Sequence, residues 1–410
     1  MTQFTHGGNV YKAAQEQHVS VERFIDFSAS INPLGPPAAV FRTLRSSVKH
    51  IVHYPDPDCR KLRLTLAQQC GMDPDMILVG NGSTELIHLL PRTLEIKSAL
   101  IIGPTFQEYA RALIEAGSIV QYVHARREQR FRPPIQDVLG QLSATRSKFD
   151  AVFLCNPNNP TGQVMNREAL CELVAAIERR QGWLIVDEAF IDYCQEQSIV
   201  SLLKQHPRML VLRSLTKFYA MPGLRIGYLL GASKVVGLLK DRQPPWSVNS
   251  VAQEVSCAVL RDAAYAKKSR AFMEHERLRF VRRLRSLSGV QVYPSAANFI
   301  LIGLPAWTSA GEVTDRLASE RLLVRDCSAL PGLNAQMIRI AIRTARENRR
   351  IFATLSTYLN TGPTRRRLRD MTCKKHKESL QTHSSSIWVV ADPFSLQLPG
   401  PVASRGPGIF

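Results

Sequence analysis

Short apolar segments alternate along this chain with longer stretches in which apolar residues recur every three or four positions. The apolar segments are bounded by Gly, Pro, Asn or charged residues; they are Ala99–Ile102, Ala151–Leu154, Trp183–Val186, Met209–Leu212 and Ile226–Leu230. Segments this short without internal alternation are typical of strands buried on both faces. Helical spacing between them, as in Glu168–Ile177, therefore predicts an α/β fold with a mostly parallel sheet covered by helices on both sides.

The pattern changes in the last part of the periodic region. Val251–Leu287 predicts one long helix, and a smaller α+β arrangement is predicted after it. Its expected strands are Val290–Val292, Phe299–Ile302 and Ile338–Ile342, and its expected helix is Val313–Arg321.

At the other end of the chain, Gly7-Gly8 and the proline-rich stretch Asn32–Pro37 predict an extended arm. The predicted parts of the chain are an N-terminal arm with the start of the small domain (1–50), a large domain (51–260), a small C-terminal domain (261–360) and a basic, disordered tail (361–410). The tail is assigned because its composition is rich in Ser, Pro and Gly with little periodicity. Cys373, His376 and His383 lie there without a fourth ligand, so no metal site is predicted.

Composition narrows the class of protein. With 410 residues, of which 45% are hydrophobic, the chain can build a large core without disulfides or metals. Its eight cysteines contain no C-x-x-C pair, which suits a reducing compartment. No apolar run approaches the ~18 residues of a membrane span, and Met1–Thr5 lack the features of a secretion signal. We therefore expect a cytoplasmic protein without a membrane partner.

The formal net charge of +19 raises the question of a nucleic-acid partner. The excess is spread along the chain, for example over Lys267–Arg285, whose apolar residues follow helical spacing. A solvated helix face explains such a segment, and no nucleic-acid-binding motif accompanies it. No nucleic-acid partner is therefore predicted, and the charge would instead attract an anionic substrate.

Candidate chemistry centres on one lysine. Lys217 follows an apolar, strand-like run; Ser214 and Thr216 stand just before it, and Arg225 follows eight residues later in a glycine-containing loop. A lysine near a serine is common on protein surfaces, but the full combination is more specific. It fits an amine that forms a Schiff base beside a phosphate held by hydroxyls and a guanidinium.

Three further segments stand at predicted strand ends. Asn81–Glu85 opens a helical pattern, where backbone N–H groups favour an anion, although alone an ordinary turn explains it better. Asn156–Gly162 places amides after another strand, but its prolines and glycine would form a turn in any case. Asp187 follows a buried run, and a carboxylate there is costly unless it is paired or functional.

Taken in order, the motifs Gly-Ser-Thr, Asn-Pro-Thr-Gly, Asp-x-Ala, Ser-x-Thr-Lys and Arg-x-Gly make the chain similar to the fold-type I pyridoxal-5'-phosphate (PLP) enzymes, the aspartate aminotransferase superfamily. The resemblance covers about residues 20–355. It implies a PLP cofactor, a large domain with a mostly parallel seven-stranded sheet, and a smaller α+β C-terminal domain. It also makes Lys217 the catalytic lysine that binds the cofactor aldehyde and Asp187 the catalytic carboxylate at the pyridine nitrogen.

The same resemblance implies a set of cofactor-binding residues. They are Gly82, Ser83, Thr84, Phe106, Asn159, Asp187, Ser214, Thr216, Lys217 and Arg225. Phe106 would stack on the ring, Asn159 would contact its 3'-oxygen, and the glycine, the hydroxyl residues and Arg225 would hold the phosphate. Phe190 stands where many relatives have a tyrosine on the 3'-oxygen, which leaves that contact to Asn159 alone or to Asn159 with Tyr219.

Further segments sharpen the resemblance. Thr-His-Gly-Gly-Asn near the start, Asp-Phe-Ser-Ala-x-Ile-Asn-Pro-Leu-Gly, Pro-Pro-Trp-Ser-Val-Asn and the pair Arg325 and Arg339 are similar to the L-threonine-O-3-phosphate decarboxylases of cobalamin biosynthesis. The alternative is the histidinol-phosphate aminotransferases, which share the lysine and arginine pattern. The implied substrate-binding residues are His6, Gly7, Ser30, Asn32, Tyr54, Asn159, Arg325 and Arg339. Relatives usually have Asn in place of Ser30, so a bridging water is expected there.

This resemblance implies a small phosphorylated amino acid as the substrate. Arg325, Arg339 and His6 would hold its phosphate and carboxylate so that carbon dioxide leaves and (R)-1-amino-2-propanol O-2-phosphate forms. Protonation at the cofactor's C4' would instead be abortive transamination. The resemblance also implies a homodimer in which Tyr54 reaches the partner's site. A regulator of this fold would carry an added DNA-binding domain, for which the sequence gives no signal.

Overall fold

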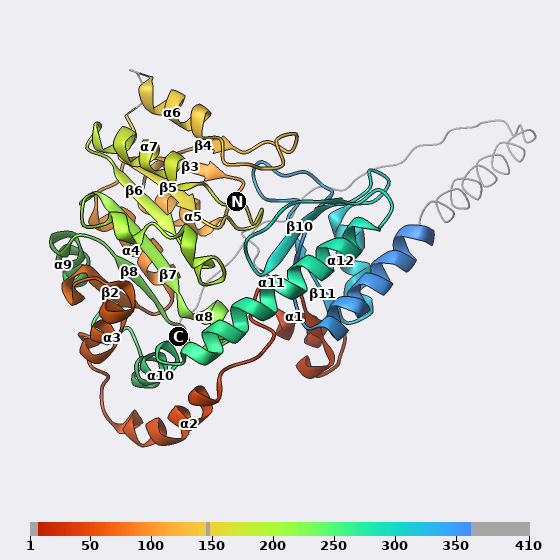
Figure 1. Cartoon of the computed structure of the whole chain (residues 1–410), viewed down its shortest axis with the longest axis horizontal. Coiled ribbons are helices and arrows are strands. Elements are labelled where there is room, and N and C mark those ends of the chain that lie inside the picture. The colour runs from red at the N-terminus through yellow and green to blue at the C-terminus, as the bar shows by residue number, and fades with distance from the viewer. Residues whose placement is uncertain (1–6, 145–147, 362–410) are drawn as a thin grey trace, which may run out of the picture. The chain divides into compact units, whose positions relative to one another are not determined.

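The computed structural model describes residues 7–144 and 148–361, and a seven-stranded sheet is its largest element (Figure 1). The strands are β2 (Ile77–Gly80), β3 (Ser98–Gly103), β4 (Ile119–His124), β5 (Ala151–Cys155), β6 (Trp183–Asp187), β7 (Met209–Ser214) and β8 (Gly227–Leu230). Their order is β2-β8-β7-β6-β5-β3-β4. Because only β8 runs antiparallel to its two neighbours, the predicted mostly parallel sheet is confirmed.

Both faces of this sheet are covered. Successive side chains of a strand point to opposite faces, and in β3 Leu100 and Ile102 belong to one buried apolar cluster whereas Ala99 and Ile101 belong to another. Helices contribute to both clusters. The first contains residues of α3 (Arg60–Cys70), α6 (Ile135–Ser143), α7 (Arg167–Glu178) and α10 (Ser250–Leu260), and the second contains residues of α4 (Ser83–Thr93), α5 (Glu108–Glu115) and α9 (Ser233–Arg242).

The C-terminal half adds a four-stranded antiparallel sheet in the order β12-β13-β10-β9. Its strands are β9 (Gln291–Val292), β10 (Phe299–Gly303), β12 (Arg325–Asp326) and β13 (Met337–Ala341), and the accompanying helices are α11 (Ala263–Arg285), α12 (Ala310–Ser319) and a last helix over 345–361. In Figure 1, α11 is the long diagonal helix between the labels of α10 and α12. The N-terminal segment joins this region because β1 (Ile25–Asp26) pairs in parallel with β11 (Leu322–Leu323).

Two expectations from the sequence need correction, and one strand of the sheet is absent from the expected set. The single helix expected over Val251–Leu287 is broken into α10 and α11, because the Asp262 side chain accepts a hydrogen bond from the Tyr265 N–H and starts a new helix. The expected extended arm is partly helical, with α1 (Val10–Glu16) and α2 (Ala38–Ser47). The edge strand β4 was not expected, since most of its residues are exposed or half-buried and its apolar signal is weak.

Short elements complete the described fold. They are α8 (Leu215–Phe218) and the 3-10 turns η1 (Val21–Arg23), η2 (Val48–Val52), η3 (Pro74–Met76), η4 (Ile191–Tyr193), η5 (Gln195–Gln197), η6 (Val200–Leu202) and η7 (Pro222–Leu224). None of the helices within 7–144 and 148–361 combines the length and the apolar character needed to cross a membrane. The predicted tail, apart from Thr361, lies outside the described residues, and so do Cys373, His376 and His383.

Candidate active site

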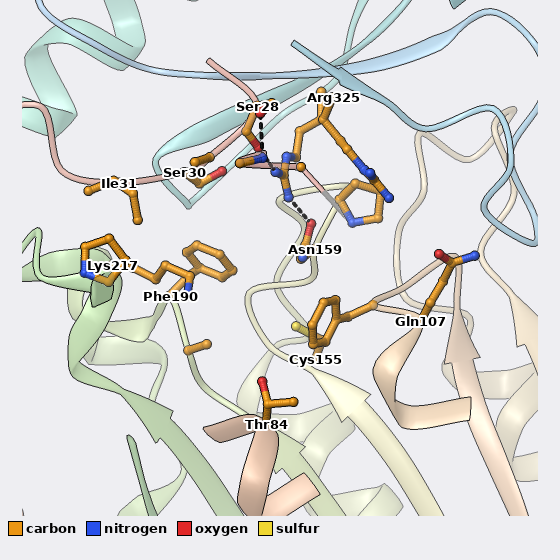
Figure 2. Close-up of a pocket in the computed structure, with 18 of the residues that line it drawn as sticks. Ser28, Ser30, Ile31, Thr84, Gln107, Cys155, Asn159, Phe190, Lys217 and Arg325 are labelled. Carbon is orange, nitrogen blue, oxygen red and sulfur yellow. Dashed lines mark hydrogen bonds between the residues drawn. The ribbon is translucent and has the colours of Figure 1, made fainter. Parts of the chain in front are cut away.

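A cavity of about 680 Å³ lies where β5, β6 and β7 end. The carboxyl ends of adjacent parallel strands meet at one edge of a sheet, which is where α/β proteins bind ligands. Figure 2 shows Thr84 at one end of this cavity and Ser28 and Arg325 at the other, with Asn159 and Lys217 between them. The predicted site residues that line it are Gly7, Ser30, Ser83, Thr84, Phe106, Asn159, Asp187, Lys217, Arg325 and Arg339.

Lys217 enters the cavity from α8, the short helix that begins directly after β7. Its Nζ donates a hydrogen bond to Thr216 Oγ1 at 2.9 Å. Burial, and to a smaller extent the nearby positive charge of Arg225, lowers the pKa of Lys217 to about 8. A substantial fraction of the amine is then neutral near physiological pH, and the neutral form is the nucleophile that a carbonyl requires.

Asp187 ends β6 and is 4% exposed. Its carboxylate accepts hydrogen bonds from the Tyr109 hydroxyl at 2.6 Å and from the Ala189 N–H at 2.9 Å. Burial raises the pKa of Asp187, and the Tyr109 hydrogen bond opposes that rise. A buried carboxylate whose partners are neutral can balance a cationic ring nitrogen in the cavity.

Sequence reasoning missed Tyr109, which also lines the cavity. Its ring meets Phe106 edge-on, with the ring centroids 5.6 Å apart. The available signal was the short spacing between Phe106, which lies just before α5, and Tyr109 in the first turn of that helix. Tyr109 therefore links the predicted stacking residue with the predicted carboxylate.

A tight loop forms the end of the cavity near Thr84. Gly82 precedes α4 with a φ of +79°, and no side chain caps this helix start. A Cβ atom at Gly82 would lie 2.6 Å from Arg225 Nη2, so only glycine allows the guanidinium this close. The hydroxyls of Ser214 and Thr216 are hydrogen-bonded at 2.7 Å. Backbone N–H groups, a guanidinium and two hydroxyls thus gather beside Ser83 and Thr84, which suits a phosphate.

Two arginines form the opposite wall. Arg325 of β12 and Arg339 of β13 are directly opposed across the strand pair, and like charges in this arrangement repel. Arg339 is 7% exposed; it donates hydrogen bonds to Ser28 O at 2.6 Å and to Asn159 Oδ1. Its Nε has no hydrogen-bond partner within the described residues. Burial lowers the pKa of Arg339 to about 10, so this wall favours an anion.

The hydroxyl of Ser30 is a second buried polar group of this cavity, after Arg339 Nε, that has no hydrogen-bond partner within the described residues. Ser30 is 3% exposed, and its Oγ also lacks a partner in the described part of the chain. A buried polar atom without a partner is costly, so a ligand atom or a water at this position would remove the cost.

Four predicted cofactor residues lie beside the cavity without lining it. Gly82 and Arg225 form the loop described above, and Ser214 and Thr216 contact one another next to Lys217. Phe190 lines the cavity and packs edge-on against Phe299. Tyr219, considered as its substitute on the 3'-oxygen, is instead buried against Phe218 and Tyr265 and is not a lining residue.

Two of the remaining predicted substrate residues, Asn32 and Tyr54, are not brought to this cavity. Asn32 is 2% exposed, and its amide donates hydrogen bonds to Phe218 O, Ser269 Oγ and Tyr265 OH. Asn32 therefore supports the backbone beside Lys217 and faces away from the cavity. Tyr54 is 80% exposed and lines a separate pocket of about 270 Å³. His6 lies outside the described residues.

Comparisons with known proteins agree with this geometry. The family model for aminotransferase class I and II matches residues 22–355. Threonine-phosphate decarboxylase of Salmonella typhimurium is 37% identical over 86% of this chain and 96% of that protein. The adenosylcobalamin biosynthesis bifunctional protein CobDQ of Leptospira interrogans is 31% identical over 86% of this chain and 40% of that protein.

Solved structures show the same relationship. L-threonine-O-3-phosphate decarboxylase from Porphyromonas gingivalis matches with a TM-score of 0.72 and 26% identity, covering 82% of this chain and 99% of that one. Histidinol-phosphate aminotransferase from Clostridium acetobutylicum matches with a TM-score of 0.76 and 28% identity over the same shares. This chain therefore belongs to the aminotransferase class I and II family.

Proposed function

We propose that this chain is a PLP-dependent carboxy-lyase that converts L-threonine O-3-phosphate to (R)-1-amino-2-propanol O-2-phosphate and carbon dioxide in cobalamin biosynthesis. The observation that carries the proposal is the wall formed by Arg325 and Arg339 in the same cavity as Lys217. A substrate with a carboxylate and a phosphate supplies one anion for each guanidinium. The similarity to threonine-phosphate decarboxylase along 96% of its length supports the same substrate.

The residues at the other end of the cavity fit PLP. Gly82 leaves space for Arg225 beside an uncapped helix start, as a phosphate requires, and Asp187 is buried with neutral partners, as a protonated ring nitrogen requires. Phe106 and Asn159 line the cavity between these groups. When bound, PLP supplies an electron sink for the charge left on the substrate's Cα.

The chain's own residues would then divide the remaining work. Arg325 and Arg339, with His6, would hold the substrate anions so that the carboxylate is the group that leaves. Asp187 would keep a proton on the ring nitrogen. Lys217, whose pKa is lowered to about 8, would hold the cofactor through its amine and would serve as a proton donor to Cα. Gly7 and Ser30, which line the cavity, would close it around the substrate.

The proposal includes a homodimer in which Tyr54 reaches the partner's cavity. Its ring lies 4.8 Å from that of Trp246, and both are exposed. Other large apolar side chains are exposed on the neighbouring α2 and η2; they are Phe41, Val48, Ile51 and Val52. A cluster of this kind is typical of a surface that another protein covers. We place the enzyme in the cytoplasm, which suits the free thiols of the seven cysteines within the described residues.

The activity is tested by incubating the PLP-loaded enzyme with phosphothreonine and identifying the product by mass. We expect stoichiometric carbon dioxide and aminopropanol phosphate, and no product from Lys217→Ala. The second candidate, histidinol-phosphate transamination, is favoured by the match to the Clostridium acetobutylicum enzyme. It predicts instead that histidinol phosphate transfers its amine to 2-oxoglutarate and gives glutamate, so each substrate is assayed with and without 2-oxoglutarate.

The shared site is tested by mixing two inactive variants. Tyr54→Ala would damage the partner's cavity and Lys217→Ala its own, so a mixed dimer keeps one intact cavity. After subunit exchange, roughly a quarter of the wild-type sites should be active. Activity that stays at the sum of the two separate variants would contradict the role of Tyr54.

A further inference from the structure

A second polar network lies behind the cavity. Glu188 is fully buried, and Arg213 is 13% exposed. Arg213 donates to Glu188 Oε2 through Nε at 2.9 Å and through Nη2 at 2.8 Å. Ser198 Oγ donates to the same oxygen at 3.0 Å, and the Ile199 N–H donates to Oε1 at 2.8 Å. The carboxylate thus receives four hydrogen bonds, and Arg213 Nη2 also donates to Ser198 Oγ at 2.7 Å.

The network joins the ends of two strands that carry site residues. β6 and β7 are parallel neighbours, with Asp187 opposite Leu212, and the Glu188 N–H donates to Leu212 O at 2.8 Å. Consecutive side chains at a strand end point to opposite sides. Asp187 therefore lines the cavity while Glu188 points behind it. On β7, Arg213 points behind the cavity in the same way, and the next residue is Ser214.

The same network also anchors a cavity wall. After Glu188 the chain leaves the sheet through Ala189 and Phe190, which line the cavity. It returns at Ser198 and Ile199, and both donate to the Glu188 carboxylate. One buried carboxylate therefore fixes the end of β6, the end of β7 and the far end of the loop between them.

We propose that Glu188, Arg213 and Ser198 are positioning residues that hold Asp187 and Lys217 in register with each other. The proposal rests on the PLP-dependent decarboxylation described above. Neither Glu188 nor Arg213 lines the cavity, so neither touches the reacting atoms. Small displacements of reacting groups change rates steeply, by on the order of 100-fold for 1 Å.

The predicted consequence of a displaced Lys217 is a change in where a proton is delivered. In the normal reaction the Cα–carboxylate bond breaks, carbon dioxide leaves, and Cα takes a proton, so the product keeps its amine. If the proton instead adds to the cofactor's C4', one water hydrolyses the linkage and leaves an aldehyde and an aminated cofactor. Both routes release carbon dioxide, and they differ only in the site of protonation.

The test therefore measures the ratio of aminated cofactor to carbon dioxide. This ratio is a property of each turnover and does not depend on how much of the enzyme is folded. We expect Arg213→Lys and Glu188→Gln to raise it by on the order of tenfold or more, with Arg213→Met raising it further than Arg213→Lys. Arg316→Met, which breaks an exposed ion pair with Glu320, is the matched control and should leave the ratio unchanged.

A double variant distinguishes a displaced site from a loss of folding. Arg213→Met with Glu188→Leu replaces a buried ion pair by apolar side chains, an exchange that proteins often tolerate. If the network positions the site, this folded variant keeps a raised ratio. A wild-type ratio in the double variant, or in both Arg213→Lys and Glu188→Gln, would overturn the proposal and leave the network a purely structural role.

A second measurement separates this proposal from the proposed activity. The dissociation constant of PLP is determined by titrating the cofactor-free protein and following the visible absorbance of the lysine-bound cofactor. We expect the constant to rise on the order of tenfold in Arg213→Lys and Glu188→Gln, and not in Arg316→Met. If wild type releases no carbon dioxide from phosphothreonine, the proposed activity fails, and an unchanged PLP constant in the variants would then overturn the positioning role independently.

Discussion

Arg339 should contribute less to stability than to substrate binding. Its guanidinium is 7% exposed and its Nε has no partner among the described residues. Arg325 stands directly opposite on the neighbouring strand. We therefore predict that Arg339→Met costs the ligand-free protein little stability while it severely weakens substrate binding.

The magnitude follows from the cost of the buried charge. Burial lowers the pKa of Arg339 to about 10, whereas a free guanidinium ionises above ~12. At ~1.4 kcal/mol for each tenfold change in the ionisation constant, holding this charge costs roughly 3 kcal/mol. The variant also loses two hydrogen bonds from this charged group, to Ser28 and to Asn159, worth about 1.5–3 kcal/mol each. These losses equal or exceed the cost of the buried charge, so the free energy of unfolding should fall by no more than ~3 kcal/mol.

The effect on substrate binding should be larger. Removing one partner of a desolvated, charge-assisted pair costs about 2–5 kcal/mol, or a KM raised at least ~30-fold. Stability is measured by urea unfolding of the cofactor-free protein in buffer without phosphate or sulfate, and binding by steady-state kinetics of the loaded enzyme. Arg316→Met, on the exposed face of α12, should change neither. A loss of more than ~3 kcal/mol in Arg339→Met would refute the reasoning, because the hydrogen bonds of Arg339 to Ser28 and Asn159 would then clearly outweigh the cost of its buried charge.

Three further predictions concern the cofactor end of the cavity. Burial lowers the pKa of Lys217 to about 8, so between pH ~8 and ~10 the folded, ligand-free protein binds fewer protons than the unfolded chain and gains stability as pH rises. In urea unfolding, Lys217→Met should therefore be more stable than wild type at pH ~8, and this difference in unfolding free energy should shrink toward pH ~10. A difference that stays constant with pH would contradict the prediction. Tyr109→Phe removes the hydrogen bond that opposes the raised pKa of Asp187 and should lower kcat ~10-fold, whereas an unchanged kcat and an unchanged absorbance titration of the bound cofactor would exclude this role. Gly82→Ala adds a Cβ that would lie 2.6 Å from Arg225 Nη2, at a residue whose φ is +79°. We expect PLP binding, measured by titration, to weaken at least ~10-fold. Wild-type affinity would show that Arg225 does not hold the phosphate.

The sequence could predict those parts of the site whose chemistry follows a local pattern. Asp187 is the last residue of a buried strand and Lys217 lies three residues after the next one, and adjacent parallel strands bring such positions to one edge. The partners that hold them could not be predicted in this way. Tyr109 reaches Asp187 across 78 residues of sequence, and its choice depends on how α5 packs against the sheet.

Asn32 also shows that partners distant in the sequence could not be predicted. The resemblance implies that Asn32 contacts the substrate, whereas in the structure the Asn32 N–H donates to Lys217 O at 3.0 Å and the side chain does not line the cavity. Which way the side chain faces depends on Tyr265 and Ser269, more than 200 residues later on α11. Those two hydroxyls satisfy the amide inside the protein, a pairing that no local pattern encodes.

Charge imbalance connects the stability of this cavity with its selectivity. The lining carboxylates Asp26 and Asp187 accept hydrogen bonds from neutral hydroxyl and N–H groups. These hydrogen bonds do not neutralise the charge of an arginine in the cavity. Lys217, Arg325 and Arg339 line the same space, and burial lowers the pKa of two of these three cations. A ligand with a single negative charge would leave part of this cost in place, whereas a cofactor phosphate together with a doubly anionic substrate removes it. The cavity thus gains most from the ligands that carry the most negative charge, and its instability when empty is the physical source of that preference.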